Sequence, residues 1–539
     1  MAGGLLRASA VMASGTVVSR VLGLAKMMLL AVAIGLVGSR SADAFSTGME
    51  LANWVYFLLL GGMLNAVLVP QIVRAAKDPD GGSGYINKLL TLISVALIGI
   101  TALAMVAAPF VVFLNQLRWP PEQLALATAF AYWCMPQILF YGLYVVLGEV
   151  LNARSIFGPY TWAPVVNNVV GILGIIVFIW LFGSDPDGMR TEVDWTPAAI
   201  GVLAGSATIG VAVQAFILYI PWRRAGLRYR PDFKWRGMGL GRTVRIAAWT
   251  FAALVVAQIA TLFNNNVIGQ ASGEGPSVSA LQNASMVFMV PHSVIAVSLA
   301  TAYFTRLSHA GQSGDMREFR ADYSASMRNI LTVMVLAAAM LFATAPYVSR
   351  VMILGASPEL VEQFWPVLQA YLLSLAAFSC LFVTQRAFYA LSDTRTPFFI
   401  VLSSQTLLVV LGLSLSPVFG VPDRYIGVGF ALVWSMAQIF GAILAALLLR
   451  RKIGSIDGRR ILACLARAAI AALPALLAGF GALLLLRSIV PTAGVGQAVL
   501  FTGIICALVV VIYLGVLALM RSPELGALRA RLRRGRGAA

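Results

Sequence analysis

Residues 9–37 read SAVMASGTVVSRVLGLAKMMLLAVAIGLV, an apolar stretch that contains two cations, Arg20 and Lys26. A helix needs about 20 apolar residues to cross roughly 30 Å of hydrocarbon, so this stretch predicts a membrane-spanning helix. It is too long, and too charged in its middle, for the apolar region of a cleaved signal peptide. We therefore expect it to remain in the protein as a first span.

Similar stretches follow one another along the chain. Its 539 residues are 60% hydrophobic and 11% charged, with a mean hydropathy of +0.87, which lies outside the range of soluble domains. The expected fold is an all-α integral membrane protein with about fourteen transmembrane helices. Breaks are expected at Gly61-Gly62 in the second span and at Pro291 in the eighth. The predicted spans are 9–37, 43–74, 86–115, 122–151, 160–183, 197–221, 244–271, 275–305, 324–354, 362–391, 396–416, 425–449, 461–486 and 495–520.

The distribution of the 39 Lys and Arg residues predicts the topology. An even number of spans puts both termini on one side, and positive residues favour the cytoplasm. Most of the 39 fall on the side of the termini, so we expect a multi-pass protein of the inner (cytoplasmic) membrane with both termini cytoplasmic. The exceptions are Arg20 and Lys26 within the first span, and Arg40, Arg118, Arg190, Arg350, Arg424 and Arg487 on the opposite side.

The net charge of +18 is concentrated in loops such as Trp222–Arg245 and in the tail after Arg521. Topology and contact with anionic membrane lipids explain such loops. Nucleic-acid binding is the weaker alternative, because no helix–turn–helix, zinc-finger or RNA-binding signature accompanies the charge. No nucleic-acid partner is expected.

A weak internal repeat recurs at a spacing of about 235 residues, which is typical of transporters built from two related lobes. Asn152-Ala153-Arg154-Ser155, followed by Pro159, resembles Tyr389-Ala390-Leu391-Ser392, followed by Pro397, and Ile34-Gly35 resembles Ile268-Gly269. We expect two six-helix lobes and two added helices. The predicted boundaries are 1–222 for the first lobe, 223–242 for a basic cytoplasmic linker, 243–452 for the second lobe, 453–520 for the added helices and 521–539 for a basic tail.

Arg20 and Lys26 are the leading candidates for a functional site. A cation at the centre of a span costs about 2.5–3.5 kcal/mol on insertion scales and usually serves a function. Ser9, Thr16 and Arg20 form one polar stripe, whereas Lys26 lies about 120° from Arg20 on an ideal helix. Both cations face one cavity only if the helix bends or unwinds, for which Gly23 is the expected place.

An alternative is that Arg20 forms a buried ion pair with Glu50 or Asp43 that only holds the first two helices together. Asp43 could equally be an N-cap, because it lies at the start of its span. A cation site that pairs internally at rest and accepts an anionic substrate would satisfy both interpretations.

Further polar residues are embedded in other spans, where amides commonly join helices and packing is the favoured interpretation. Three adjacent Asn residues cannot all face one neighbouring helix, so at least one should face water or an unwound segment. The candidates for coupling or gating are Glu50, Glu149, Asn152 and Asn264, and the other embedded amides are Asn167, Asn168, Asn265, Asn266, Gln282 and Asn283.

Enzymatic chemistry is not indicated, because the chain has two histidines and no metalloprotease, nucleophile-elbow, P-loop or dinucleotide signature. His309 falls in a loop, and for His292 helix packing is favoured over proton relay. The four cysteines lie in apolar stretches without CxxC spacing, so neither a disulfide nor a metal site is expected. We expect a transporter without a cofactor.

Several segments together resemble the MurJ/MviN lipid II flippases of the multidrug/oligosaccharidyl-lipid/polysaccharide exporter superfamily. The resembling segments span the first eleven predicted helices: Ser19-Arg20-Val21-Leu22-Gly23, Ala42-Asp43-Ala44-Phe45, Leu64-Asn65-Ala66, Val69-Pro70, Leu151-Asn152-Ala153-Arg154, Ala163-Pro164-Val165-Val166-Asn167-Asn168, Arg386-Ala387-Phe388-Tyr389-Ala390 and Thr396-Pro397.

The resemblance implies two lobes around a cationic cavity, with the last two helices lining a groove for a polyprenyl tail. It implies substrate-binding roles for Arg20, Lys26, Asp43 and Asn53. The chain departs from the family where many members have cations, with Tyr56-Phe57 in the second span and Ser285-Met286 in the eighth. The Ala- and Arg-rich composition resembles that of actinobacterial members.

The resemblance implies a flippase that moves lipid II, the undecaprenyl-diphosphate-linked peptidoglycan precursor, to the outer leaflet by alternating access. Alternatives are export of another polysaccharide-lipid, a drug or cation antiporter of the same superfamily, or a non-transporting scaffold that recruits cell-wall synthesis proteins. Membrane potential, Na⁺ and H⁺ all remain open as driving forces.

Overall fold

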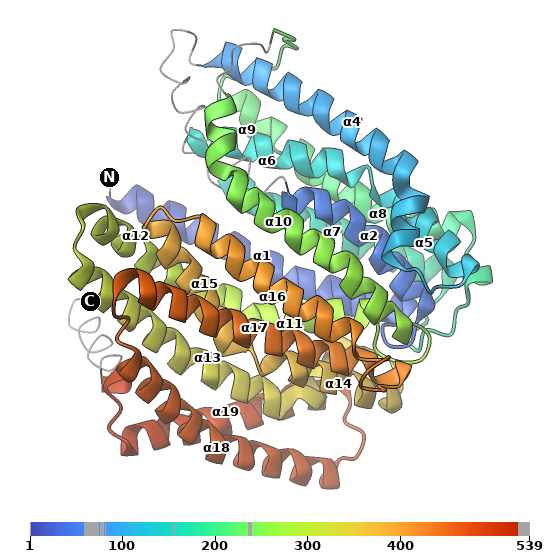
Figure 1. Ribbon diagram of the computed structural model, residues 1–539. Coiled ribbons are helices and arrows are strands. Elements are labelled where there is room, and N and C mark those ends of the chain that lie inside the picture. The colour runs from blue at the N-terminus through green and yellow to red at the C-terminus, as the bar shows by residue number, and fades with distance from the viewer. Residues whose placement is uncertain are drawn as a thin grey trace. The chain divides into compact units, whose positions relative to one another are not determined.

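Helices make up the regular structure of this computed structural model, which describes residues 2–58, 75, 80, 82–154, 156, 158–234 and 240–526. The described residues include no β-strand (Figure 1). This is the expected outcome for an apolar chain, because lipid offers no partner for backbone N–H and C=O groups and a helix satisfies them internally. The all-α prediction is confirmed.

The chain forms two compact units, each described by itself. Unit 1 comprises Met1–Gly273 and Ser277–Ser279, and unit 2 comprises Glu274–Pro276 and Ala280–Ala539. The helices of unit 1 are α1 (Ala2–Ile34), α2 (Arg40–Leu58), α4 (Ser83–Asn115), α5 (Pro121–Cys134), α6 (Gln137–Ala153), α7 (Gly158–Phe182), α8 (Pro197–Phe216), α9 (Tyr219–Arg224) and α10 (Leu240–Ile268). Those that follow are α11 (Val278–Pro291), α12 (Val297–Ser313), α13 (Met316–Met352), α14 (Pro358–Leu372), α15 (Leu375–Ala390), α16 (Arg395–Leu413), α17 (Asp423–Ile453), α18 (Gly458–Ile489) and α19 (Val495–Leu519).

Thirteen helical stretches among the described residues are long and apolar enough to cross a membrane. They correspond to every predicted span except the second. That span starts in α2, and most of its remainder, including Gly61-Gly62, lies outside the described residues. The prediction of about fourteen transmembrane helices is confirmed.

Four of the predicted spans are interrupted within the described residues. In the eighth, Pro291 is followed by a π-helical turn, His292–Ala296, at the predicted break. The other three interruptions were not predicted: the fourth span divides between α5 and α6 at Met135-Pro136, the sixth between α8 and α9 at Ile217-Leu218, and the tenth between α14 and α15 at Leu373-Ser374.

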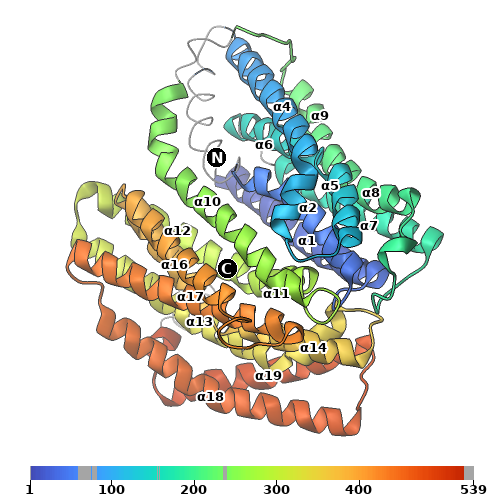
Figure 2. The same ribbon diagram turned by 45° about the vertical axis from the view of Figure 1, so that its right-hand side comes forward.

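In unit 1, α1 packs against α7, α7 against α8, and α2 against α5 (Figure 2). The buried face of α6 joins α4, α8 and α9 in an apolar cluster that includes Tyr144, Val150 and Trp222. Helix α10 also packs in this unit, against α2 and α4. The predicted second lobe starts at residue 243, in the first turn of α10, because that boundary follows the repeat and not the packing. The six-helix division remains a prediction.

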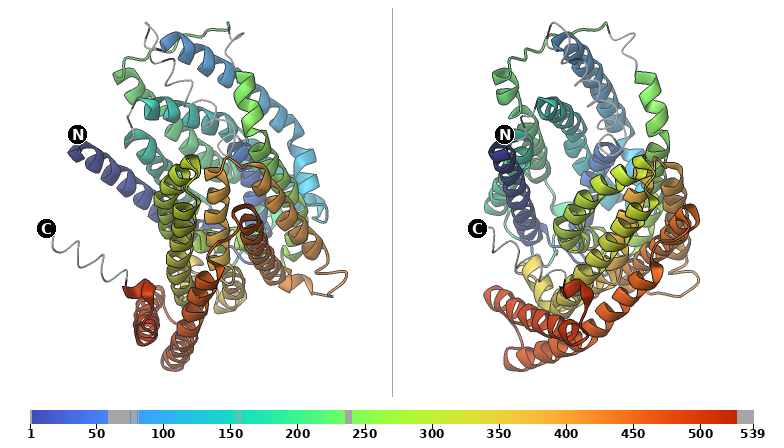
Figure 3. Two further views of the ribbon diagram at one scale, coloured as in Figure 1. Left: turned by 60° about the vertical axis from the view of Figure 1, so that its left-hand side comes forward. Right: turned by 90° about the vertical axis from the view of Figure 1, so that its left-hand side faces the viewer.

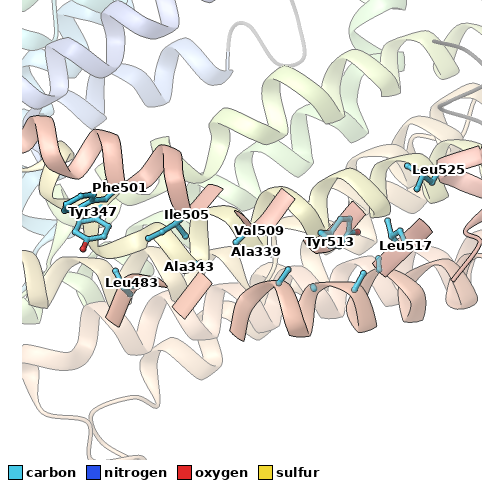
Figure 4. Close-up of a cluster of buried hydrophobic side chains, with 14 of the residues drawn as sticks. Ala339, Ala343, Tyr347, Leu483, Phe501, Ile505, Val509, Tyr513, Leu517 and Leu525 are labelled. Atoms are coloured by element: carbon cyan, nitrogen blue, oxygen red, sulfur yellow. The ribbon is translucent and has the colours of Figure 1, made fainter. Parts of the chain in front are cut away.

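In unit 2, α13, α18 and α19 pack together as a three-helix group (Figures 1 and 4). Small residues on α13 and α18, such as Ala343 and Ala471, allow close approach to the larger Ile505, Val509 and Tyr513 of α19. Burial of these apolar side chains leaves Leu477 and Val511 on the outer surface, 74% and 68% exposed, as suits a surface in lipid.

Candidate functional site

Helix α1 carries both predicted cations and is continuous from Ala2 to Ile34 (Figure 3). Unwinding at Gly23, one of the two ways in which the cations could share a cavity, does not occur. Arg20 is exposed, and Lys26 is partly buried on another face of the helix. The two side chains therefore have different surroundings, as their spacing on a regular helix requires.

Lys26 lies against α7. A Cβ added at Gly171 would come within 3.0 Å of Lys26 Cε and 3.2 Å of Lys26 Nζ, so this glycine leaves the room that the lysine occupies. One turn before Gly171, Asn168 donates from Nδ2 to the carbonyl oxygen of Ser19 at 2.8 Å. The amide thus attaches α7 to α1 between the two cations, which agrees with the packing interpretation of the embedded amides.

Asp43 is fully buried in the first turn of α2 and is held by neutral donors. Ser272 Oγ donates to Asp43 Oδ2 at 2.7 Å, and the backbone N–H of Ser279 donates to Asp43 Oδ1 at 2.9 Å. The hydroxyl that accepts from the start of α2 belongs to Ser39, which receives the N–H of Ala42. Asp43 therefore connects α2 to residues 272–279 and is not the N-cap.

Glu50 lies about two turns further along α2 and accepts a hydrogen bond from Asn265 Nδ2 at 3.0 Å. Asn53 is half-buried, one turn beyond Glu50. Among the described residues, Arg20 forms no ion pair. The structure therefore does not contain the predicted buried pair of Arg20 with Asp43 or Glu50.

The three adjacent asparagines of α10 face different partners, as expected. Asn265 contacts α2, whereas Asn266 donates to Leu114 O at 2.7 Å and accepts from Leu117 N at 2.7 Å, where α4 ends. Asn264 is 8% exposed and its Oδ1 has no hydrogen-bond partner. An unpaired buried carbonyl oxygen is unfavourable in lipid, so Asn264 retains its interest as a gating candidate.

Glu149 and Asn152 lie together near the end of α6. The Asn152 amide lies beside the Glu149 carboxyl, and Glu149 is 7% exposed. The structure thus brings Glu149 together with Asn152, and it joins Asp43 and Glu50 of α2 to partners at Ser272, Ser279 and Asn265. Arg20 and Lys26 share α1 but lie on different faces of it. Asn53 joins none of these by a hydrogen bond.

The partners of Asp43 were not predicted from the sequence. Ser272 also accepts from Gln123 Nε2 at 2.8 Å, and Ser279 Oγ donates to Leu36 O at 2.6 Å. No spacing rule connects these serines to α2, since they lie more than two hundred positions away. In the part of the chain that is described, no three His, Cys, Asp or Glu side chains gather as metal ligands would.

Two predicted features lie beyond the described residues. The segments Leu64-Asn65-Ala66 and Val69-Pro70 are outside them, as are the side chains of Tyr56 and Phe57. Met286, at the other position where family cations are common, is described and is 38% exposed on α11.

Comparison with known proteins supports one family. The model of the family "Lipid II flippase MurJ" matches residues 31–513. A probable lipid II flippase MurJ of Rhizobium meliloti is 26% identical over 422 residues, which cover 77% of this chain and 76% of that protein. A protein of the same description from Borreliella burgdorferi is 22% identical over 469 residues, covering 85% and 86%.

Solved structures show the same fold. A lipid II flippase MurJ in an inward closed conformation matches 94% of this chain and 98% of its own length, with a TM-score of 0.73 and 19% identity. An inward-facing multidrug transporter of the MATE family, in the MOP superfamily, matches 82% and 96%, with a TM-score of 0.66 and 15% identity. Since the family match extends over most of the sequence, the chain belongs to the lipid II flippase MurJ family.

Proposed function

We propose that this protein moves lipid II from the inner to the outer leaflet of the cytoplasmic membrane by alternating access. The observation that carries the proposal is the pair of cations on α1. Arg20 is exposed and without an ion pair among the described residues, although its helix is apolar and membrane-spanning. A diphosphate is the complementary ligand, because guanidinium groups bind phosphate oxygens through charge-assisted hydrogen bonds.

In this proposal Arg20 makes first contact with the diphosphate, and Lys26, packed beside Gly171, supplies a second charge deeper in the span. Asp43 and Asn53 of α2, which is in the same unit as α1, are the other two proposed substrate-binding residues. The exposed Met286 supplies no cation where many relatives have one, so Arg20 and Lys26 should bear a larger share of substrate binding than in those relatives.

The predicted topology, with both termini cytoplasmic, orients α1 so that Arg20 lies nearer the inner leaflet than Lys26. We propose that α18 and α19 hold the polyprenyl tail, for which their exposed apolar surfaces are suitable. Membrane potential can drive the cycle, because moving one net charge is worth about 2.3 kcal/mol per 100 mV. Glu50, Glu149, Asn152 and Asn264 are the residues at which Na⁺ or H⁺ coupling or gating would be sought.

Complementation of a strain depleted of its lipid II flippase tests the proposal, with outer-leaflet lipid II as the readout. Wild type should restore it, and Arg20→Ala and Lys26→Ala should each reduce it roughly tenfold or more, since a charge-assisted hydrogen bond contributes about 1.5–3 kcal/mol. Arg20→Lys should retain part of the activity because it retains the charge.

The exposed Arg424, distant in sequence from α1, provides the matched control as Arg424→Ala and should behave as wild type. Immunoblots of the membrane fraction separate lost transport from lost protein. If wild type fails in a host with the same precursor chemistry, the lipid II assignment is wrong. If both alanine variants transport normally, the assignment survives and the cation mechanism is wrong.

A further inference from the structure

A pocket of about 120 Å³ lies in unit 2 where α13 ends, α14 begins and α18 ends. Its lining includes Tyr347, Arg350, Glu362 and Arg487. One ordered water needs roughly 10–15 Å³ of such space, so the pocket has room for a small polar group with its hydration. The predicted topology places this end of the helices at the outer membrane surface, since Arg350 and Arg487 are among the few basic residues on that side.

The two arginines give the pocket a net positive charge. Arg487 Nη2 pairs with Glu362 Oε1 at 2.9 Å, and Glu362 Oε2 accepts a hydrogen bond from Trp365 Nε1 at 2.8 Å. The carboxylate is therefore satisfied at both oxygens. Arg350 donates from Nη1 to the carbonyl oxygen of Ala356, which holds the side chain in place and leaves other N–H groups of its guanidinium available.

Tyr347 provides an independent sign that the pocket can take a ligand. Its side chain is 4% exposed, its ring packs against Phe501 at a centroid distance of 5.4 Å, and its hydroxyl has no hydrogen-bond partner. Figure 4 shows the hydroxyl pointing away from Phe501. A buried donor without a partner is unfavourable and uncommon, so an acceptor in the adjoining pocket is expected.

We propose that this pocket binds the phosphate group of an anionic phospholipid, with Arg350 and Arg487 as its cationic contacts and Tyr347 as a hydroxyl donor. Guanidinium groups suit phosphate oxygens geometrically and electrostatically. The first turn of α14 lines the pocket at Pro358, so its helix dipole adds to the attraction.

A bound phosphate would contact three helices at once and hold α14 and α18 at the end of α13. This role is independent of the substrate proposed for the α1 cations, because it concerns a resident lipid of the surrounding membrane. The pocket volume is sufficient for a single phosphate group.

Thermal unfolding of the delipidated, full-length protein in detergent tests the proposal, with short-chain phosphatidylglycerol and inorganic phosphate titrated separately at constant ionic strength. Phosphatidylglycerol should raise the unfolding temperature. In the double variant Arg350→Gln/Arg487→Gln, the apparent affinity of the protein for phosphatidylglycerol should fall roughly tenfold or more, because charge-assisted hydrogen bonds are lost. The exposed Arg424 supplies the control, and Arg424→Gln should retain wild-type affinity.

Tyr347→Phe tests the site even if the double variant fails to fold, because it keeps both charges and the packing on Phe501. Its affinity for phosphatidylglycerol should fall roughly two- to tenfold, with no loss of unfolding temperature in the absence of lipid. Equal affinity in wild type and Tyr347→Phe would overturn the proposal. An equal response to inorganic phosphate, with nothing added by the lipid, would assign the pocket to free phosphate and overturn the lipid assignment.

Discussion

The fourth and tenth predicted spans are interrupted at matching places, by different chemistry. In unit 1, α6 begins at Gln137 after Pro136, and in unit 2, α15 begins at Leu375 after Ser374, a separation close to that of the sequence repeat. Pro136 has no N–H and so cannot continue the hydrogen bonds of α5. No proline is present at the second interruption, so we attribute that break to contacts with a neighbouring helix.

A hydroxyl from a neighbouring helix satisfies the freed backbone at each break. Thr208 of α8 donates to Trp133 O at 2.6 Å and accepts from Gln137 Nε2 at 2.9 Å. Ser435 of α17 donates to Ala370 O at 2.6 Å and lies 3.0 Å from Ser374 Oγ. In each unit the hydroxyl comes from the helix two spans after the interrupted one, since α8 and α17 are the sixth and twelfth predicted spans. The two arrangements differ in that Thr208 also holds a buried side-chain amide.

The largest effect is therefore expected for Thr208→Val, which leaves Trp133 O and the fully buried Gln137 amide without this partner. We expect a loss of about 2 kcal/mol in unfolding free energy, measured by thermal or SDS unfolding in detergent. Adding Gln137→Leu should recover part of this loss, because it removes the unsatisfied Gln137 amide, whereas Trp133 O stays without its donor. A double variant as unstable as Thr208→Val alone would contradict this explanation.

A smaller loss of about 1 kcal/mol is expected for Ser435→Ala. Ala370 O loses its donor and Ser374 Oγ loses its contact with Ser435. Ser374 Oγ still donates to Tyr371 O at 2.9 Å, so it keeps a partner. The matched control is Ser403→Ala on α16, where an exposed hydroxyl bonds within its own helix. If Ser435→Ala were as harmless as Ser403→Ala, the break in unit 2 would not depend on α17.

The smallest loss of stability is expected at the position that follows the repeated segments Asn152–Ser155 and Tyr389–Ser392. This position is Ile156 in unit 1 and Asp393 in unit 2. Asp393 pairs with Lys452 and accepts from the N–H and hydroxyl of Thr396. Burial alone would raise the pKa of Asp393, but Lys452 and Thr396 hold it below its usual value. Its stabilisation is therefore complete above the ordinary carboxyl pKa and is lost as pH falls through the lowered one.

We expect Asp393→Asn to cost about 0.5–1 kcal/mol near neutral pH, since Lys452 is partly exposed and solvent screens the pair. The difference from wild type should vanish in strong acid, as measured by unfolding temperature between pH 3 and 7. Ile156→Ala supplies the comparison from unit 1, and its effect should not change with pH. A constant difference for Asp393→Asn across that range would show that its charge is not involved.

Residue type alone predicted the spans and the break at Pro291, because hydropathy over twenty residues and a missing N–H are local properties. The break at Ser374 was not predictable in the same way, since nothing in its neighbourhood marks Ser435 as a partner. The candidate residues show the same division. Arg20 and Lys26 were identified by their cost in an apolar span, whereas Ser272, Ser279 and Asn265 emerged only as partners of Asp43 and Glu50.

The sequence by itself determined that this protein is an all-helical membrane protein of about fourteen spans, and that two cations lie in its first helix. It did so because lipid penalises polar groups residue by residue. Only the tertiary structure decided that Arg20 is exposed while Lys26 lies against Gly171, and that Tyr347 lines a pocket with Arg350 and Arg487. Those facts depend on which distant helices meet, and packing between helices is set by complementarity of whole surfaces.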